Sequence, residues 1–428
     1  MLALAPDAAT VRAGQGQAAP NRWSGTGCCA DPPAVWGLCQ GSGKQPYQVT
    51  VDLAQPAHRC SCPSRKHPCK HIVGLLLLWS DGQVASAGHP ADFAAQWLSD
   101  RAGRAAKAAE RRAAPVADPA AAQRRAEQRD AKVRAGLDEL DRWLADQIRT
   151  GLAGTERAGY AHFSQVAARM VDAQAPGVAA DLKRLPGVAA SGEGWAGRLL
   201  SAYARLYLLI AAHRRAESLP APLAATVRAH LGYPVAREAV LALPPVRDRW
   251  SALARRDTVD EKVRTRQTWL RGADTGRDAL VLSFAAPGQS LEDGLTPGTT
   301  IDAELHFYPG AAPLRALIGP GQTDLGTFVR PAAGSLDAAL GGFAAARAAD
   351  PWLDGWPALV TAVPTATERG WVLAGEDGAL PLRPNRASDG PWRLVAVAGG
   401  RAVPVFGEWD GASFDALAAV REHSVVEL

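Results

Sequence analysis

The chain has 428 residues, of which 47% are hydrophobic and 21% are charged, and these fractions are typical of globular domains. A chain of this length predicts two or three domains, each able to bury its own core. The formal net charge of +4 is small for the length, so the total charge does not indicate a nucleic-acid-binding protein.

The sequence predicts neither a membrane segment nor an export signal. The longest dense apolar run, Ile72 to Trp79, is far shorter than the roughly 18 residues that a membrane-spanning helix needs. The N-terminus lacks the basic start and sustained apolar stretch of a signal peptide. All six cysteines precede position 70, whereas a disulfide-stabilised secreted protein would spread them more widely. We therefore expect a cytoplasmic protein.

Residues 1–22 are rich in Ala, Gly, Gln and Pro, and we expect them to be flexible. Residues 23–99 form the first predicted domain. Within it, Tyr47 to Leu53 alternates apolar and polar residues, which predicts a strand. The apolar run from Ile72 predicts a core helix soon afterwards.

Residues 100–136 are predicted to be a partly helical linker rich in Ala and Arg. Between Arg101 and Arg134 the sequence has ten basic and four acidic residues, an excess of six positive charges (10 − 4). Ala and Arg favour helix, but no sustained apolar stripe is present, and Pro115 and Pro119 interrupt the segment.

Residues 137–245 have helical periodicity and predict a helical domain. Two sets of apolar residues each share one helical face: Leu137, Leu140, Leu144, Ile148 and Leu152, and then Phe163, Val166, Ala167, Met170 and Val171. Leu199 to Ile210 is apolar on most sides and predicts a buried helix.

Residues 246–428 predict a β-rich C-terminal domain. Alternating residues from Ile301 to Phe307 and the run Leu280 to Phe284 indicate strands, and Trp392 to Val397 with Ala402 to Phe406 flank two glycines as in a hairpin. The expected fold class is therefore α+β and multidomain, with an N-terminal ββα zinc-finger module, a helical middle region and a β-rich C-terminal domain.

The strongest functional signal is the cluster Cys60, Cys62, Cys69 and His71. Residues two apart in an extended chain project to the same side, so Cys60 and Cys62 can face one ion. Pro68 precedes the second pair and suits the start of a helix. Three thiolates and one imidazole complete a tetrahedral structural zinc site without a position for catalytic water. One structural Zn²⁺ is therefore predicted.

Residues close to this cluster in sequence include other candidate zinc ligands and several basic side chains. His58 and His67 are close enough in sequence to compete, but His71 repeats the two-residue spacing and opens the apolar helix. With Zn²⁺ the site carries a net charge of about −1 (−3 + 2), which Arg59, Arg65, Lys66 and Lys70 would offset. The same four cations are candidate contacts for a nucleic acid or a protein partner.

The spacing CxC–x₆–CxH followed by an apolar helix, CSCPSRKHPCKHIVGLLLLW here, resembles the SWIM-type zinc finger. The similarity to bacterial stand-alone SWIM proteins extends upstream through GLCQGSGKQPYQVTVDLAQPAHR and, more weakly, downstream through RTRQTWLRG, FYPGAAPLRAL and VFGEWDG. The resemblance implies that Cys60, Cys62, Cys69 and His71 are the zinc ligands. It also implies a β-hairpin-plus-helix module that binds DNA or protein, and an association with a MoxR-type AAA ATPase and von Willebrand A-type (VWA) proteins.

Other motifs carry weaker signals. Cys28, Cys29 and Cys39 lack a nearby His and paired spacing, so they are interpreted as small apolar residues rather than as a second metal site. Gly41 to Lys44 lacks the spacing of a phosphate-binding loop and is interpreted as a turn.

No hydrolase or metalloprotease motif is present, and His306 is interpreted as a surface residue. Trp352 and Trp356 are interpreted as core or loop residues, with partner anchors as the alternative. Hence the sequence predicts a non-enzymatic zinc-binding adaptor for a protein partner, with no evident small-molecule substrate and no membrane association. The alternative is a DNA-binding protein that uses the basic face around the zinc.

Overall fold

The structure is a computed structural model, which describes residues 8–41, 45–54, 57–64, 68–113, 119–259, 263–286, 291, 295–383 and 391–428. The chain divides into two compact units. The first comprises residues 1–117, 258–265 and 283–294, and the second comprises residues 118–257, 266–282 and 295–428. Among the described residues, no helix combines the length and the apolar character that crossing a membrane requires.

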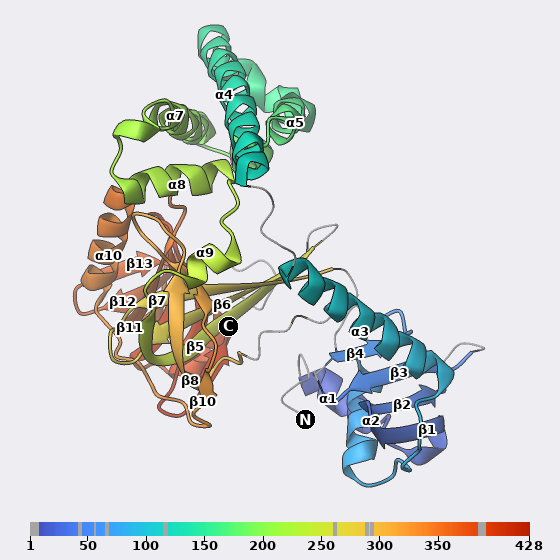
Figure 1. Cartoon of the computed structure of the whole chain (residues 1–428). Helices are drawn as coiled ribbons and strands as arrows, with labels where there is room; N and C mark the ends of the chain where they lie inside the picture. The colour runs from blue at the N-terminus through green and yellow to red at the C-terminus, as the bar shows by residue number, and fades with distance from the viewer. Residues whose placement is uncertain are drawn as a thin grey trace. The chain divides into compact units, whose positions relative to one another are not determined.

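The first unit is built on a four-stranded antiparallel sheet in the order β1-β2-β3-β4 (Figure 1). Its elements in chain order are α1 (Ala8–Gln15), η2 (Pro20–Arg22), β1 (Trp23–Ala30), β2 (Pro33–Cys39), β3 (Tyr47–Asp52), β4 (Ala57–Cys60), α2 (Lys70–Ser80) and α3 (Asp92–Ala113). The strand expected from Tyr47 is thus β3, and the apolar helix expected from Ile72 is α2.

Helices α2 and α3 pack on opposite faces of this sheet. Alternate residues of β2 point to opposite sides, so Val35 joins the core with α2, whereas Ala34 and Trp36 join the core with α3. An ion pair of 3.2 Å between Arg101 and Asp52 also fixes α3 to β3, with both side chains mostly buried. The sheet is therefore covered on both faces, and α2 has a rigid support.

Residues 8–22 differ from the flexible segment that their composition predicts, because they form α1 and η2 and pack on α2. Two glycines allow the close approach. A Cβ on Gly14 would lie 2.5 Å from Val73, and a Cβ on Gly74 would lie 2.7 Å from the Cβ of Gln17. The Trp23 indole also donates a hydrogen bond of 2.6 Å to the Gln17 carbonyl. These contacts order a segment that shows no strong local signal.

The second unit begins with a helical bundle. Its elements are α4 (Pro119–Thr150), η3 (Leu152–Gly154), α5 (Thr155–Asp172), α6 (Pro176–Ala189), α7 (Trp195–Arg214), η4 (Ala216–Ser218), α8 (Ala221–Leu231) and α9 (Arg237–Leu241). Helix α4 starts at Pro119, a favourable first helical position, and Val133 is fully buried in the bundle core. The bundle therefore begins before residue 137, inside the segment expected to be a linker.

Both predicted apolar faces of the bundle are observed, although each includes one exposed residue, Ile148 or Val171. Leu137, Leu140 and Leu144 are buried, whereas Ile148 is 51% exposed. Helix α7 also has an exposed side at Leu200, so it is not buried all round as its composition predicts.

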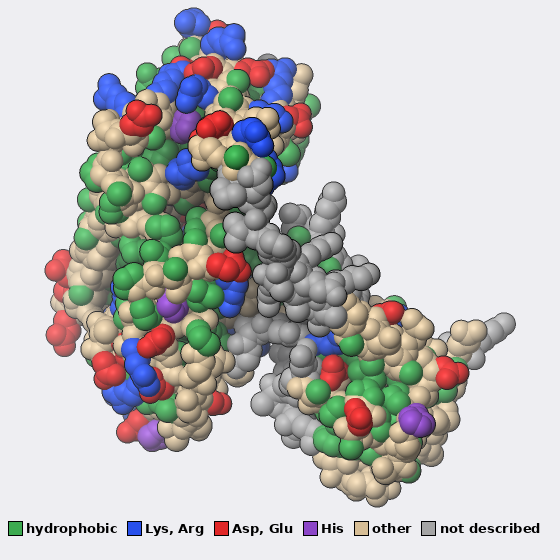
Figure 2. Space-filling model, in the orientation of Figure 1, with side chains coloured by type: hydrophobic (Ala, Val, Ile, Leu, Met, Phe, Trp, Pro, Cys, Tyr) green, Lys and Arg blue, Asp and Glu red, His purple; other side chains and the backbone are tan. Residues whose placement is uncertain are grey.

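Basic and acidic side chains are interspersed over the bundle (Figure 2). Arg214 pairs with Asp138 at 2.7 Å and with Asp141 at 2.8 Å, and Arg169 pairs with Glu139. Several of the cations on this part of the chain are therefore already paired with carboxylates of the bundle.

The C-terminal part of the second unit contains two sheets, one after the other in sequence. The first has the order β10-β8-β5-β6-β7-β9, with β9 also pairing with β8 and so closing the sheet on itself. Its strands are β5 (Val246–Val259), β6 (Arg264–Gly272), β7 (Asp278–Ala285), β8 (Thr300–Phe307), β9 (Arg315–Ile318) and β10 (Thr323–Asp324). The strands expected at 280–284 and 301–307 are β7 and β8.

The second sheet is antiparallel, with the order β13-β12-β11-β14-β15-β16. Its elements are α10 (Leu336–Ala349), β11 (Trp356–Thr367), β12 (Gly370–Gly375), β13 (Gly378–Pro381), α11 (Trp392–Ala398), β14 (Val403–Trp409), β15 (Phe414–Val420) and β16 (Val425–Glu427).

The hairpin prediction for Trp392 to Val397 is wrong, because this segment is α11. Gly399, with φ of 57°, is the left-handed C-cap of that helix and not a hairpin turn.

The positions of His306 and Trp352 bear on two of the sequence-based expectations. His306 is buried, and its Nδ1 lies 2.8 Å from the Leu243 carbonyl oxygen, so it is not a surface residue. Trp352, which follows α10, is buried among residues of the helical bundle. The bundle and the β-rich region thus share a core within the second unit.

Candidate metal centre

The first pair of candidate ligands is held by strand β4 and the residue that follows it. Cys60 ends β4 and pairs in register with Val49 of β3. The next residue, Ser61, donates its backbone N–H to the Gln48 carbonyl at 3.0 Å, and its hydroxyl accepts from the Gln48 N–H at 2.9 Å. These bonds keep the chain alongside β3 as far as Ser61, and Cys62 follows directly at a bend. The two sulfurs therefore project to the same side of the sheet.

The second pair is held by the start of α2. Cys69 is the N-cap residue with extended backbone, and His71 is the second residue of the helix. Both side chains are buried, with 0% and 5% of their surface exposed. Behind them Ile72, Leu75 and other apolar residues of α2 pack against the sheet. Burial of this helix face fixes the position of Cys69 and His71 relative to β4.

All four candidate ligands come together. One donor atom from each of Cys60, Cys62, Cys69 and His71 lies within 4.8 Å of every other. The His71 Nδ1 atom lies 3.8 Å from the Cys60 sulfur and 3.9 Å from the Cys69 sulfur. A tetrahedral zinc with Zn–S of about 2.3 Å and Zn–N of about 2.0 Å requires ligand atoms roughly 3.5 to 3.8 Å apart. The side chains therefore fit a zinc ion.

The thiols interact strongly within this group. A hydrogen bond from the Cys60 thiol, together with contacts to His71 and the Ile72 N–H, lowers the pKa of Cys69 to about 3. The same hydrogen bond, with burial, raises the pKa of Cys60. Burial is the main reason that the pKa of Cys62 is also raised. A divalent cation among the sulfurs would offset their mutual repulsion and favour the thiolate form of all three.

Cys60, Cys62, Cys69 and His71 are thus positioned to bind one zinc ion, as the sequence predicts. Four protein ligands complete the tetrahedral set, so the metal would supply structural stabilisation. It would link the end of β4 to the start of α2. Without the metal, these two elements are connected in the chain only by the loop between them. His58 is not part of the cluster, and His67 lies outside the described residues.

The cations predicted around the site are only partly described. Arg59, on β4, and Lys70, the first residue of α2, are both exposed. Arg65 and Lys66 lie outside the described residues.

The other three cysteines are free thiols outside the ligand set, although Cys39 packs in the same core as Cys69. Cys29 and Cys39 are buried, and Cys28 is half-buried. The Cys29 thiol lies 3.0 Å from the Pro32 carbonyl oxygen, and the Cys39 thiol lies 3.7 Å from Gln17 Oε1. None belongs to the cluster that can hold a metal among the described residues.

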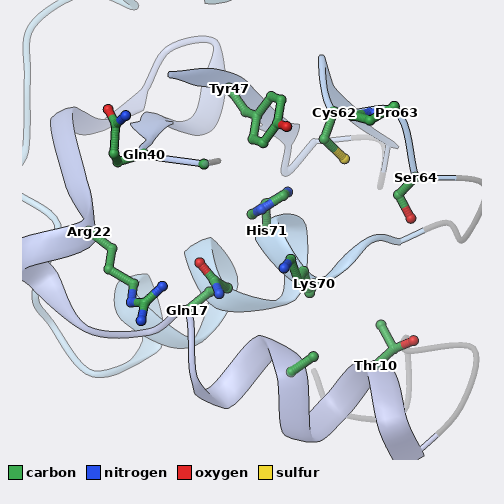
Figure 3. Close-up of a pocket in the computed structure, with 12 residues that line it drawn as sticks. Thr10, Gln17, Arg22, Gln40, Tyr47, Cys62, Pro63, Ser64, Lys70 and His71 are labelled. Atoms are coloured by element: carbon green, nitrogen blue, oxygen red, sulfur yellow. The ribbon is translucent and has the colours of Figure 1, made fainter. Parts of the chain in front are cut away.

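A cleft of about 730 Å³ adjoins the metal site (Figure 3). Residues from α1, η2, β3, the segments that follow α1 and β2, and the two metal-binding segments line it: Thr10, Ala13, Gln17, Arg22, Gln40, Gly41, Tyr47, Cys62, Pro63, Ser64, Lys70 and His71. Sequence reasoning identified Lys70, Cys62 and His71 but missed the contribution of α1 and η2, because these residues carry no motif. Only the folding of α1 onto α2 brings them to the site.

Comparison with protein families finds two matches, both within the described architecture. Residues 47–79, from β3 to α2, match the SWIM zinc finger. Residues 128–231, from α4 to α8, match the SWIM-associated four-helix bundle domain. No match was found among curated proteins or among solved structures. The chain thus contains both SWIM-related domains, which confirms its resemblance to SWIM-type zinc finger proteins.

Proposed function

We propose that this SWIM-type zinc finger protein is a non-enzymatic adaptor, whose zinc module holds a surface for a protein partner. The observation that carries the proposal is the closed donor set of Cys60, Cys62, Cys69 and His71. With all four positions filled by protein, the metal has no site for a substrate or an activated water. What the metal can do is fix the shape of the surface around it.

The partner that we propose is a MoxR-type AAA ATPase, acting together with a VWA-domain protein. This part of the proposal rests on the resemblance to bacterial SWIM proteins. The thiolate ligands need a compartment where thiols stay reduced, so we place the adaptor in the cytoplasm.

A second candidate function is nucleic-acid binding, which the exposed cations Arg59 and Lys70 beside the metal site favour. Phosphate contacts of this kind are insensitive to sequence and weaken steeply with salt. The closed metal site is compatible with both functions, so binding experiments must separate them.

Co-elution of the zinc-loaded chain with the MoxR-type ATPase of the same genome, measured by size-exclusion chromatography with light scattering, tests the proposal. We expect a complex with the wild-type chain and with Cys28→Ser, a cysteine outside the metal cluster, and no complex with Cys69→Ser. The proposal is refuted if no complex forms while a short DNA duplex binds with steep salt dependence and Arg59→Gln weakens that binding.

A further inference from the structure

The cleft beside the metal site is rich in hydrogen-bond donors and positive charge. Arg22 and Lys70 contribute a guanidinium and an ammonium group, and Gln17 lies between them in the close-up view (Figure 3). The residues that line the cleft in the described part of the chain include no Asp or Glu. A ligand with anionic oxygens would therefore find donors and would meet no carboxylate on the walls, where two cations stand against the net charge of about −1 of the zinc-loaded site.

Gln17 is the most informative of these side chains because it is 91% buried (9% exposed) yet lines the cleft. Its carbonyl accepts the Trp23 indole N–H, and its side-chain oxygen faces the Cys39 thiol. Among the described residues, none accepts a hydrogen bond from its Nε2 atom. This nitrogen is not among the described side-chain atoms that are fully buried without a partner, so a ligand in the cleft can reach it.

The cleft is large enough to admit a chain segment as its ligand. A volume of about 730 Å³ is far larger than the roughly 30 Å³ that one water molecule occupies in the liquid. It lies within the range of sites that enclose drug-sized ligands, on the order of 300 to 1,000 Å³. Several residues of an extended peptide would fill such a space.

The aromatic content of the cleft disfavours a single-stranded nucleic acid. Such ligands bind by stacking successive bases on exposed rings. Tyr47 is the one Phe, Trp or Tyr side chain among the described lining residues, and its ring already packs against His71, with centroids 5.0 Å apart. No row of open rings is therefore available for bases.

We propose that this cleft binds the carboxylate groups of an acidic segment on the partner protein, an inference that rests on the proposed adaptor function. The Arg22 guanidinium and the Lys70 ammonium pair with carboxylates, and the Gln17 amide donates to a carboxylate or a peptide carbonyl. Because Cys62 and His71 form one wall, loss of zinc disrupts the cleft. Partner binding is thereby coupled to metal loading.

A fluorescein-labelled hexaglutamate peptide, titrated into the zinc-loaded full-length chain and followed by fluorescence anisotropy, tests this site. Arg22→Gln and Gln17→Met should each weaken binding about tenfold, which corresponds to about 1.4 kcal/mol, because each removes a hydrogen bond to a charged group. Arg12→Gln is the matched control, because this exposed arginine of α1 lies outside the cleft and its loss changes the net charge equally. That variant should bind as the wild type does.

The proposal is overturned if hexaglutamine binds as tightly as hexaglutamate, or if Arg12→Gln weakens binding as much as Arg22→Gln. It is also overturned if a poly-dT oligonucleotide binds in the cleft, displacing the peptide and losing affinity with Arg22→Gln. Failure here and failure of the adaptor function are distinguishable. If the ATPase still co-elutes with the Arg22→Gln variant, only the cleft is excluded as its docking site.

Discussion

Trp352 helps to join the β-rich region of the second unit to the helical bundle, together with the His230–Asp350 and Arg205–Asp354 pairs, and removing it should weaken this connection. Its side chain is buried in the bundle core, and its indole N–H donates a hydrogen bond of 3.0 Å to the Arg205 carbonyl on α7. Its ring lies 5.6 Å from that of His230 on α8, centroid to centroid. Asp350 fixes the backbone before it, accepting from the Trp352 N–H at 3.0 Å.

The expected cost of Trp352→Ala follows from these contacts. Truncating a buried Trp to Ala typically lowers the free energy of unfolding by about 3 to 5 kcal/mol. With 6% of its surface exposed, Trp352 belongs to this class. Trp352→Phe retains a large aromatic ring but loses the hydrogen bond to Arg205. It should therefore lower the free energy of unfolding by less than Trp352→Ala does, and the lost hydrogen bond should account for about 1 kcal/mol of the decrease.

Urea unfolding followed by circular dichroism at 222 nm, which reports mainly on the helices, measures both variants. The wild-type bundle and β-rich region should unfold together, whereas Trp352→Ala should unfold earlier and in separable steps. A loss below about 1 kcal/mol for Trp352→Ala, with a single transition retained, would refute the role of Trp352 as the joining residue.

The remaining predictions concern packing, pH and metal. A Cβ at Gly177 on α6 would lie 2.0 Å from the His230 carbonyl oxygen. Gly177→Ala should therefore lower the free energy of unfolding by about 1 to 3 kcal/mol. In the same helix Gly187 has no atom within 4 Å of such a Cβ, so Gly187→Ala should raise it by about 0.5 to 1 kcal/mol in the same urea assay. Burial lowers the pKa of His213 below its ordinary value of 6.5, so its native state binds a proton less readily than the unfolded chain. Its contribution to bundle stability should be complete above pH 6.5 and should decline as the pH falls below that value. Urea titrations at several pH values measure this decline, which His213→Gln should reduce. Chelation of zinc should increase amide hydrogen exchange across residues 47–79 and leave residues 128–231 protected, because the bundle has its own core. Equal deprotection of both segments would contradict this independence.

The metal site could be predicted from the sequence because all of its geometry is local. Cys60 and Cys62 lie at the end of one strand, and Cys69 and His71 lie at the start of the next helix. Strand alternation and a helix start therefore determine which side chains converge. The apolar run that follows, beginning at Ile72, predicts the helix by itself.

The cleft could not be predicted in this way, because it depends on packing between distant segments. Gln17 and Arg22 reach it only because Gly14 and Gly74 let α1 lie close against α2. The Gly, Gln and Pro content of residues 1–22, by itself, favours disorder. Tertiary contacts override that preference here.

Two other outcomes show the same limit. Trp352 contacts Arg205, which is 147 positions away in sequence, and no local pattern indicates that pairing. The two glycines after Trp392 to Ala398 suit a hairpin turn, but the left-handed conformation of Gly399 serves equally well as a helix C-cap. In this segment Leu394 and Ala398, four residues apart, are the buried residues, as on a helix face.

The most direct test of a structural zinc site is the metal content of the purified chain, measured by mass spectrometry together with its circular dichroism spectrum. The wild-type chain and Cys28→Ser should each contain one zinc ion per chain. Cys69→Ser should contain none and should lose the ordered structure of residues 47–79, since binding free energy of about 10 kcal/mol or more contributes to folding in such modules. A wild-type chain without zinc, or a Cys69→Ser variant that retains one equivalent, would contradict the account.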